Sequence, residues 1–187
     1  YPSFDGAALV GALDEFLVDR GESIPVQSPN RDWLKAADGP AVICHIGQQI
    51  ADALGYAQAQ GILHRDLKPA NVLLDAHGNV KLVDFNVSSC TKLDGVDPAN
   101  HFGGSLAYMS LEQLEACSPW HDYLPDELTD KTDIYSLGVT LFELLTGSRP
   151  FQNASAQDMS AILEELSRQR KAGRNDHELA QLDSQPL

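Results

Sequence analysis

Hydrophobic residues near the start of the chain recur at the spacing of an amphipathic helix. Over residues 6–20 they stand three or four positions apart, at Leu9, Leu13, Phe16 and Leu17. Because this spacing places them on one face, we predict a helix over residues 6–20 that stops at Gly21. Residues 21–39 are rich in Pro, Ser, Asn and Gly, and this composition predicts a loop.

A second and longer helical pattern runs from Pro40 to Gly61. The hydrophobic residues on its predicted face are Val42, Ile46, Ile50, Ala53, Leu54 and Ala57. A proline in the first turn and a glycine after the last turn are typical of helix ends. The pattern therefore predicts a helix that delivers the chain directly to His64.

Two short β-type runs come next, at residues 72–74 and 80–83. The residues between them, DAHGN, are turn formers, so we predict a β-hairpin. Together with the predicted helices, this hairpin indicates a fold that is mainly α with a small β-hairpin.

The second half of the chain begins with a long stretch that has no regular pattern. Residues 86–131 show no sustained periodicity, and such a stretch in a compact domain is usually functional or mobile, so we expect regulation here.

A helix that is apolar on most of its circumference is predicted over residues 134–145, with Gly147 as its stop, and it should be buried at the centre of the fold. Ser155 and Asp158 resemble a capping box, which predicts a further helix from about residue 155. The last twenty residues are polar and are expected to fray.

The composition is that of one soluble domain with a hydrophobic core. The chain has 187 residues, of which 43% are hydrophobic and 21% charged. Its formal net charge of −14 would repel nucleic acids and anionic membranes, so we expect neither as a partner. The cysteines, Cys44, Cys90 and Cys117, contain no C-x-x-C pair, which favours a reducing compartment over a disulfide framework or a zinc site.

The chain shows no sequence signal for a membrane. Its hydrophobic runs are too short to span a bilayer, and its first residues do not resemble a signal peptide. We therefore expect a cytoplasmic protein, with no membrane contact from this segment. The chain starts with Tyr1 rather than Met, which suggests a segment of a longer parent, and an anchor could lie in the rest of that parent.

The residues with the clearest chemistry stand together at positions 64–71, HRDLKPAN, and an Asp-Phe pair comes after the predicted hairpin. Transfer of a γ-phosphoryl group needs a carboxylate to accept a hydroxyl proton and a divalent metal to offset developing charge. Asp66 fits the role of the base, and Lys68, two residues later, could neutralise the transferred group. Asn71 and Asp84 provide hard oxygen ligands for Mg²⁺, whose shell the phosphates of ATP would complete. The pattern indicates ATP-dependent phosphoryl transfer.

Each of these residues also has an ordinary explanation. Asp and Asn are common in turns, and a lone Asp-Phe pair carries almost no information. The joint occurrence of eight consecutive motif residues and a subsequent Asp-Phe pair favours the catalytic interpretation.

Taken together, the motifs resemble those of the eukaryotic-type serine/threonine protein kinase family, over the large C-terminal lobe of its catalytic domain. Residues 64–71 resemble the catalytic loop, in which Lys68 is the form found in serine/threonine kinases. Residues 81–85 are similar to the strand and metal-binding motif of the family, and residues 104–112 to the end of its activation segment. Residues 133–138 are similar to the start of its buried central helix.

The resemblance implies that several side chains assist the catalytic loop. Asp133 would hydrogen-bond the backbone of this loop. Ser105 would lie beside Asp66 and Lys68. Leu73 would pack under the adenine of ATP. The implied substrates are Mg-ATP and a Ser or Thr hydroxyl of a protein.

Other implied roles are structural or regulatory. His64 and Phe85 would lie in an apolar packing column. Arg65 could pair with a phosphate on the activation segment, for which the candidate acceptors are Ser88, Ser89 and Thr91. The alternative is that these are ordinary polar loop residues. Glu112 would form an ion pair with an arginine of a later helix. Without that arginine, Glu112 is either exposed or costs about 3 to 5 kcal/mol as an unpaired buried charge.

Three departures from the family pattern bear on activity. Asn86 stands where a glycine usually follows Asp-Phe, and Leu111 stands where a proline usually precedes Glu112. The third departure is the largest, because no G-x-G-x-x-G motif occurs and Lys35, the only lysine before Asp66, does not follow a β-type run. We therefore expect that the small lobe and the last helices are absent and that the isolated chain is poorly active.

The expected lobe, residues 1–187, divides into three parts. Residues 1–38 form the helix and loop after the hinge, residues 39–112 carry the catalytic loop, metal-binding motif and activation segment, and residues 113–187 carry the central helix and the helix after it. The leading hypothesis is a serine/threonine protein kinase. Two alternatives stay open: a pseudokinase or scaffold that acts by binding proteins, and a small-molecule kinase that shares the fold.

Overall fold

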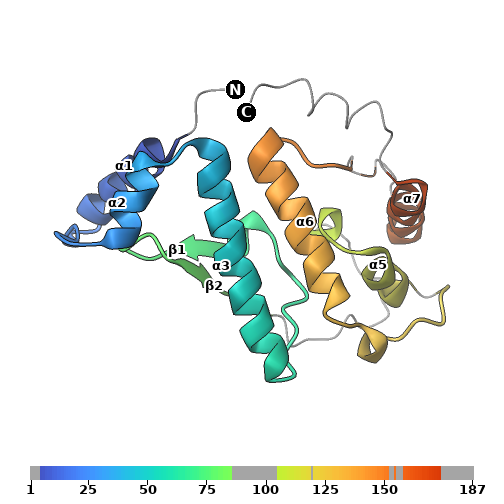
Figure 1. Ribbon diagram of the computed structural model, residues 1–187. Helices are drawn as coiled ribbons and strands as arrows, with labels where there is room; N and C mark the ends of the chain where they lie inside the picture. The colour runs from blue at the N-terminus through green and yellow to red at the C-terminus, as the bar shows by residue number, and fades with distance from the viewer. Residues whose placement is uncertain (1–4, 86–104, 119, 152–153, 155–157, 174–187) are drawn as a thin grey trace.

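The computed structural model describes residues 5–85, 105–118, 120–151, 154 and 158–173 (Figure 1). The α-helices in these ranges are α1 (Gly6–Asp19), α2 (Pro29–Ala36), α3 (Gly39–Ala59), α5 (Leu111–Cys117), α6 (Lys131–Thr146) and α7 (Met159–Ala172). Short 3₁₀ turns are η1 (Pro69–Asn71), η2 (Ser105–Ala107) and η3 (Pro125–Glu127). The strands β1 (Val72–Leu74) and β2 (Val80–Leu82) form an antiparallel hairpin in which Leu73 is opposite Lys81. The expected mainly helical fold with a small hairpin is confirmed.

The first helix forms where the hydrophobic spacing predicted it. Asp5 caps α1 by accepting a hydrogen bond from the backbone N–H of Ala8 (2.8 Å), which satisfies an otherwise unpaired donor. Val10 on its buried face packs with Leu34 of α2 and Val42 of α3. These contacts join the first helices into one hydrophobic cluster.

The prediction of a loop over residues 21–39 is wrong in its second part, where α2 forms. Ser28 caps this helix by accepting a hydrogen bond from a backbone N–H, and Pro29 occupies the first turn. Hydrophobic periodicity missed α2 because Leu34 is its sole buried apolar residue. The capping signal, rather than the apolar pattern, identifies this helix.

The buried guanidinium of Arg31 fastens α2 to two neighbouring elements. It forms an ion pair with Asp14 of α1 and donates to the carbonyl of Ala76 in the hairpin turn (2.9 Å). The hydroxyl of Ser28 donates to the carbonyl of His77 in the same turn (3.3 Å). These bonds fix the hairpin turn against the N-terminal helices.

The long helices α3 and α6 lie next to each other and carry the central core (Figure 1). Ile50 of α3 packs with Leu67 of the loop after α3 and with Leu137 of α6, and the hairpin packs on the same cluster. Gly47 permits close approach of the two helices, since a Cβ at this position would lie 3.0 Å from the side chain of Leu141. The core therefore sits directly beneath the loop that connects α3 to the hairpin.

The prediction that the central helix is buried around most of its circumference is wrong. α6 begins at Lys131, before the expected start, and is followed by Gly147, whose left-handed backbone (φ 70°) ends it. Ile134 and Leu145 are 56% and 48% exposed. α3 packs on one face of α6, whereas Ile134 and Leu145 lie on parts of α6 that no described residue covers. A hydrophobic pattern does not determine how many neighbours a helix has.

A third hydrophobic cluster joins α5 and α7. Its buried members are Met109, Leu114, Cys117, Leu163 and Leu166. α5 lies within residues 86–131, for which no regular element was expected, and its 7 residues are too few to show a hydrophobic period. Cys117 is disulfide-bonded, which the spacing of the cysteines did not suggest.

The last described helix, α7, begins at Met159 rather than near residue 155. Asp158 caps it by accepting a hydrogen bond from the N–H of Ala161 (2.9 Å), and Ser155 lies outside the described residues. Of the polar tail that was expected to fray, the structure describes only the part up to Gly173, and this part is helical as far as Ala172. None of the described helices combines the length and hydrophobicity needed to cross a bilayer.

Candidate active site

The 64–71 loop, which comes after α3, starts against the first turn of α6. The carboxylate of Asp133 in that turn accepts hydrogen bonds from the backbone N–H groups of His64 and Arg65, both at 2.8 Å. Asp133 is buried, so these charge-assisted bonds lie away from water. They fix the start of the loop, and they are the contacts that the resemblance implied for Asp133.

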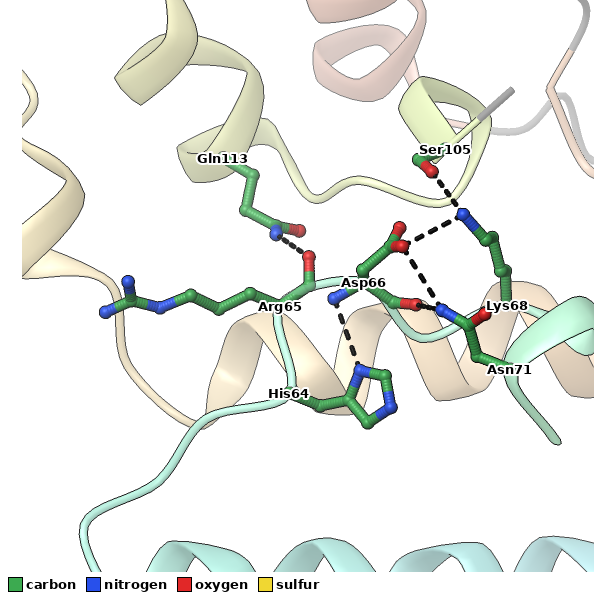
Figure 2. A network of polar contacts seen from close by, with 7 residues as sticks. All are labelled: His64, Arg65, Asp66, Lys68, Asn71, Ser105 and Gln113. Carbon is green, nitrogen blue, oxygen red and sulfur yellow. Dashed lines mark hydrogen bonds and ion pairs between the residues drawn. The ribbon is translucent and has the colours of Figure 1, made fainter. Parts of the chain in front are cut away.

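Arg65 adopts a left-handed backbone conformation (φ 63°), which is strained for a residue with a side chain. Its carbonyl accepts a hydrogen bond from the side-chain amide of Gln113 in α5 (2.8 Å), and its side chain points away from Asp66 (Figure 2). Within the described residues, positive φ occurs at one other non-glycine position, Asp84 (φ 56°). The strained positions thus belong to the candidate site, where strain is often part of the function.

The side chain of Asp66 stands at the centre of a polar network (Figure 2). Its Oδ2 accepts hydrogen bonds from Lys68 Nζ (2.9 Å) and Asn71 Nδ2 (3.2 Å). The same nitrogen of Asn71 donates to the backbone carbonyl of Asp66 (2.8 Å), and Lys68 also donates to Ser105 Oγ (2.7 Å). Side chains from the 64–71 loop and from η2 therefore meet at one place.

The ion pair between Asp66 and Lys68 is neither buried nor fully exposed. Both side chains are 20% exposed. A carboxylate in this position stays within reach of a hydroxyl group from solvent or from a bound molecule, while the ammonium places a positive charge beside it. A proton acceptor next to a fixed cation is what phosphoryl transfer requires.

The hairpin brings Asp84 to the 64–71 loop through the residues on either side of it. The N–H of Val83 donates to the carbonyl of Asn71 (3.1 Å), and the ring of Phe85 lies 4.4 Å from the ring of His64. Asp84 itself is exposed. Because both of its neighbours contact the loop, the backbone of Asp84 is held beside the network.

The imidazole of His64 is buried beneath the loop. Burial lowers the pKa of His64, against the opposing effect of the nearby carboxylates of Asp133 and Asp66. The ring also packs on Phe85. A neutral, packed ring is typical of a structural histidine rather than of a group that carries protons during a reaction.

The oxygen donors that Asn71 and Asp84 offer suit a hard cation. The amide nitrogen of Asn71 is committed to Asp66, which leaves Asn71 Oδ1 as a potential ligand, and Asp84 offers an exposed carboxylate. Mg²⁺ prefers such oxygen ligands and keeps several positions for phosphate or water. In the part of the chain that the structure describes, no three His, Cys, Asp or Glu side chains are grouped as a metal site. The donor set therefore fits Mg²⁺ that arrives with a nucleotide.

Other residues with predicted roles lie apart from the polar network. Leu73 is 50% exposed on β1. Glu112 is exposed on α5, so the cost of an unpaired buried carboxylate does not arise there. The departure at Asn86 and the candidate phosphate acceptors Ser88, Ser89 and Thr91 lie outside the described residues.

Sequence reasoning missed the contribution of Gln113. This buried side chain completes a capping box with Ser110 at the start of α5 and also binds the carbonyl of Arg65. The S-x-x-Q spacing could have indicated the helix. No local signal points to Arg65, because the contact joins positions 48 residues apart.

Comparison with known proteins places this site in a family. The family model described as the protein kinase domain matches residues 32–186. The chain belongs to the protein kinase family. The matched range includes residues 64–71.

Kinases of bacterial and human origin are similar to this chain. Serine/threonine-protein kinase PrkC of Bacillus subtilis (strain 168) is 38% identical over 117 residues, which are 63% of this chain and 17% of that protein. Probable serine/threonine-protein kinase PknB of Lactococcus lactis subsp. lactis (strain IL1403) is 39% identical over 108 residues, 58% of this chain and 16% of that protein. Human serine/threonine-protein kinase 32B is 37% identical over 118 residues, 62% of this chain and 26% of that protein.

These similarities support a eukaryotic-type serine/threonine protein kinase, which is a transferase. The chain spans only a minor part of the length of the curated relatives it matches.

Proposed function

We propose that the intact protein transfers the γ-phosphoryl group of Mg-ATP to Ser or Thr hydroxyls of protein substrates. The observation that carries this proposal is the network in which Asp66 Oδ2 meets Lys68 Nζ at 2.9 Å and Asn71 Nδ2 at 3.2 Å. In this proposal residues 1–187 supply the large lobe of the kinase, with its parts at residues 1–38, 39–112 and 113–187.

Asp66 acts as the base. Its contacts with Lys68 and Asn71 both go to Oδ2, so among the described residues Oδ1 has no side-chain donor and can receive a proton from a substrate hydroxyl. Its partial exposure lets that hydroxyl approach. Because the start of the loop is anchored by Asp133, the carboxylate keeps its position while the proton moves.

Lys68 neutralises the group that is transferred. Its ammonium lies between Asp66 and Ser105, at 2.9 Å and 2.7 Å from their oxygens. A fixed positive charge at this point stabilises negative charge that develops on an incoming phosphoryl group. Ser105, which lies in η2 outside the 64–71 loop, orients the ammonium by accepting its hydrogen bond.

Asn71 and Asp84 hold the metal, and Leu73 contacts the adenine. When bound, ATP supplies the phosphoryl group and Mg²⁺ offsets the negative charge of the phosphates. The support for these roles is the donor set, an amide oxygen of Asn71 and the exposed carboxylate of Asp84, whose neighbours Val83 and Phe85 contact the 64–71 loop. The exposed position of Leu73 on β1 supports an apolar contact with a ligand.

The charge of the chain bears on the class of molecule that serves as substrate. The formal net charge of −14 favours a protein substrate over a nucleic acid or an anionic membrane. We also propose the cytoplasm as the place of action, although the disulfide of Cys117 is more typical of an oxidising compartment.

The test is Asp66→Asn in the intact protein. Asparagine keeps the size of the side chain but does not accept a proton at neutral pH, so phosphate transfer to a protein substrate should fall about 10²- to 10⁴-fold. The measurement is the initial rate of phosphate incorporation with saturating Mg-ATP, together with the thermal unfolding midpoint. The matched control is Asp52→Asn, at an exposed position on α3, which should keep full activity.

Equal rates for the wild type and Asp66→Asn would overturn the catalytic role of Asp66. A wild-type protein without transfer activity, but with a folded lobe that binds other proteins, would instead favour the scaffold alternative.

A further inference from the structure

Arg170, near the end of α7, reaches across to the segment that carries Ser105. Its guanidinium donates hydrogen bonds to the carbonyls of Ala107 (2.8 Å), Met109 (3.2 Å) and Leu106 (3.4 Å). The contacts join positions 61 to 64 residues apart. We call residues 105–109 the Ser105 segment. It consists of η2 and the two residues after it, which lead to the N-terminal cap of α5.

Removing the charged guanidinium of Arg170 from water costs free energy unless its contacts in the protein compensate for the lost hydration. Partial burial removes water from the guanidinium and lowers the pKa of Arg170. Among the described residues it forms hydrogen bonds with carbonyls rather than an ion pair with a carboxylate. The guanidinium also lies 4.0 Å from the ring centre of Phe151 and 5.9 Å from that of Tyr135, which are favourable positions for a cation. Nε and Nη2 of this half-buried arginine are thus committed to the backbone that they contact, whereas Nη1 has no hydrogen-bond partner among the described residues.

The Ser105 segment is held from three directions. On the side of the 64–71 loop, Ser105 receives the hydrogen bond of Lys68 (2.7 Å). From α6, the hydroxyl of Ser136 donates to the carbonyl of Tyr108 (2.9 Å), and the hydroxyl of Tyr108 donates to the carboxylate of Glu143. The third attachment is Arg170. Its guanidinium can donate hydrogen bonds to several carbonyls at once, because its N–H donors form a rigid planar fork.

We propose that Arg170 is a positioning residue for the protein substrate, and this inference rests on the proposed function. By fixing the Ser105 segment, Arg170 sets where Ser105 meets Lys68 beside Asp66. The nucleotide side depends on other contacts, because Asn71 and Asp84 are held by the 64–71 loop and the hairpin. Loss of Arg170 should therefore impair use of the protein substrate while use of ATP changes little.

The experiment compares Arg170→Ala with Arg168→Ala in the intact protein. Arg168 is exposed, lies two residues away on α7 and pairs with Glu165 of the same helix, so its removal should leave activity unchanged. For Arg170→Ala, the KM for a peptide substrate should rise about tenfold or more, and the KM for ATP should stay within about twofold of the wild-type value. Arg170→Lys keeps the charge over Phe151 but lacks the fork, so we expect an intermediate KM for the peptide.

A second measurement does not depend on activity. The amides of Tyr108 and Met109 donate to the carbonyls of Ser105 and Leu106, so their hydrogen exchange reports the order of the Ser105 segment. Exchange of peptides that contain residues 105–109 should become faster in Arg170→Ala and stay unchanged in Arg168→Ala. If Arg170→Ala unfolds the protein, Arg170→Lys provides the same comparison.

The outcomes separate this inference from the proposed function. A peptide KM equal to that of Arg168→Ala, an equal rise of both KM values, or unchanged exchange over residues 105–109 would each overturn the role of Arg170. A wild-type protein that transfers no phosphate would sink the proposed function, and the exchange experiment would still show whether Arg170 holds the segment.

Discussion

The two ends of the 64–71 loop differ in how they are held. At its beginning, the backbone is fixed from outside the loop by the buried carboxylate of Asp133 and the buried amide of Gln113. At its end, side chains of the loop bind one another, since Lys68 and Asn71 both contact Asp66, and these groups face a partly exposed site. The first end is a buried frame and the second is an accessible polar site.

This difference indicates that the beginning of the loop contributes to stability and its end to activity. Bonds between backbone groups and buried side chains are costly to lose, because the freed donors cannot find water. Bonds among partly exposed side chains contribute little to stability, because water can replace them. Changes in the frame should therefore reduce stability, whereas Asp66→Asn should reduce activity with little effect on unfolding.

The largest effect on stability is expected for Asp133→Ala. The substitution leaves the N–H groups of His64 and Arg65 without their acceptor in a buried place, which should cost about 3 to 5 kcal/mol. The measurement is the free energy of unfolding of the intact protein in urea.

Asp130→Ala is the matched control for Asp133→Ala. Asp130 precedes α6 and makes no capping hydrogen bond with its side chain, so the free energy of unfolding should change by less than about 0.5 kcal/mol. Equal stability of the two alanine variants would show that the hydrogen bonds of Asp133 do not stabilise the start of the loop. Should Asp133→Ala fail to fold, Asp133→Asn, which keeps one acceptor oxygen, gives the smaller change to measure.

A smaller effect is expected for Gln113→Ala. It removes the hydrogen bond to the carbonyl of Arg65 and one half of the capping box with Ser110, which together should cost about 2 kcal/mol of unfolding free energy. Gln48→Ala, at an exposed position on α3, is the control and should be nearly neutral. A Gln113→Ala protein as stable as Gln48→Ala would show that Asp133 alone fixes the start of the loop.

The smallest effect concerns the pH dependence of stability and comes from His64. Burial lowers the pKa of His64 in the folded protein, so below the ordinary histidine pKa of about 6.5 the unfolded chain binds a proton that folded His64 does not. The contribution of neutral His64 is thus complete above about pH 6.5 and is lost as the pH falls towards its folded pKa. Its slope should be at most about 1.4 kcal/mol per pH unit.

His64→Phe measures this contribution, because phenylalanine keeps an aromatic ring against Phe85 and does not titrate. Urea unfolding between pH 7 and pH 5 should show a shallower loss of stability for this variant than for the wild type. The control is His77→Gln at an exposed position in the hairpin turn, which should follow the wild-type slope. Parallel slopes for wild type and His64→Phe would mean that His64 takes up its proton equally in the folded and unfolded states.

The elements that the sequence predicted well are those whose signal is local and repeated. The helices α1 and α3 show several hydrophobic turns, and the hairpin combines β-type residues with turn formers. The helices α2 and α5 were missed because each is short and owes its position to a cap, at Ser28 and Ser110 respectively. For α6, the hydrophobic pattern predicted the helix but not the exposure of Ile134 and Leu145, since exposure depends on which neighbours are present.

The candidate site divides in the same way. The residues around Asp66 lie within a few positions of one another, so their grouping could be predicted from a continuous motif. The contacts of Gln113 with Arg65 and of Arg170 with the Ser105 segment join positions far apart in the chain, and neither carries a local pattern.

The amino-acid sequence by itself determined the types of the reactive groups and their order along a single loop, because covalent spacing alone keeps a carboxylate, an ammonium and an amide close together. The tertiary structure decided how that loop is oriented and how firmly it is held. The loop is anchored from α5 and α6, and the Ser105 segment from α7. Only packing of these helices brings their side chains to the two places.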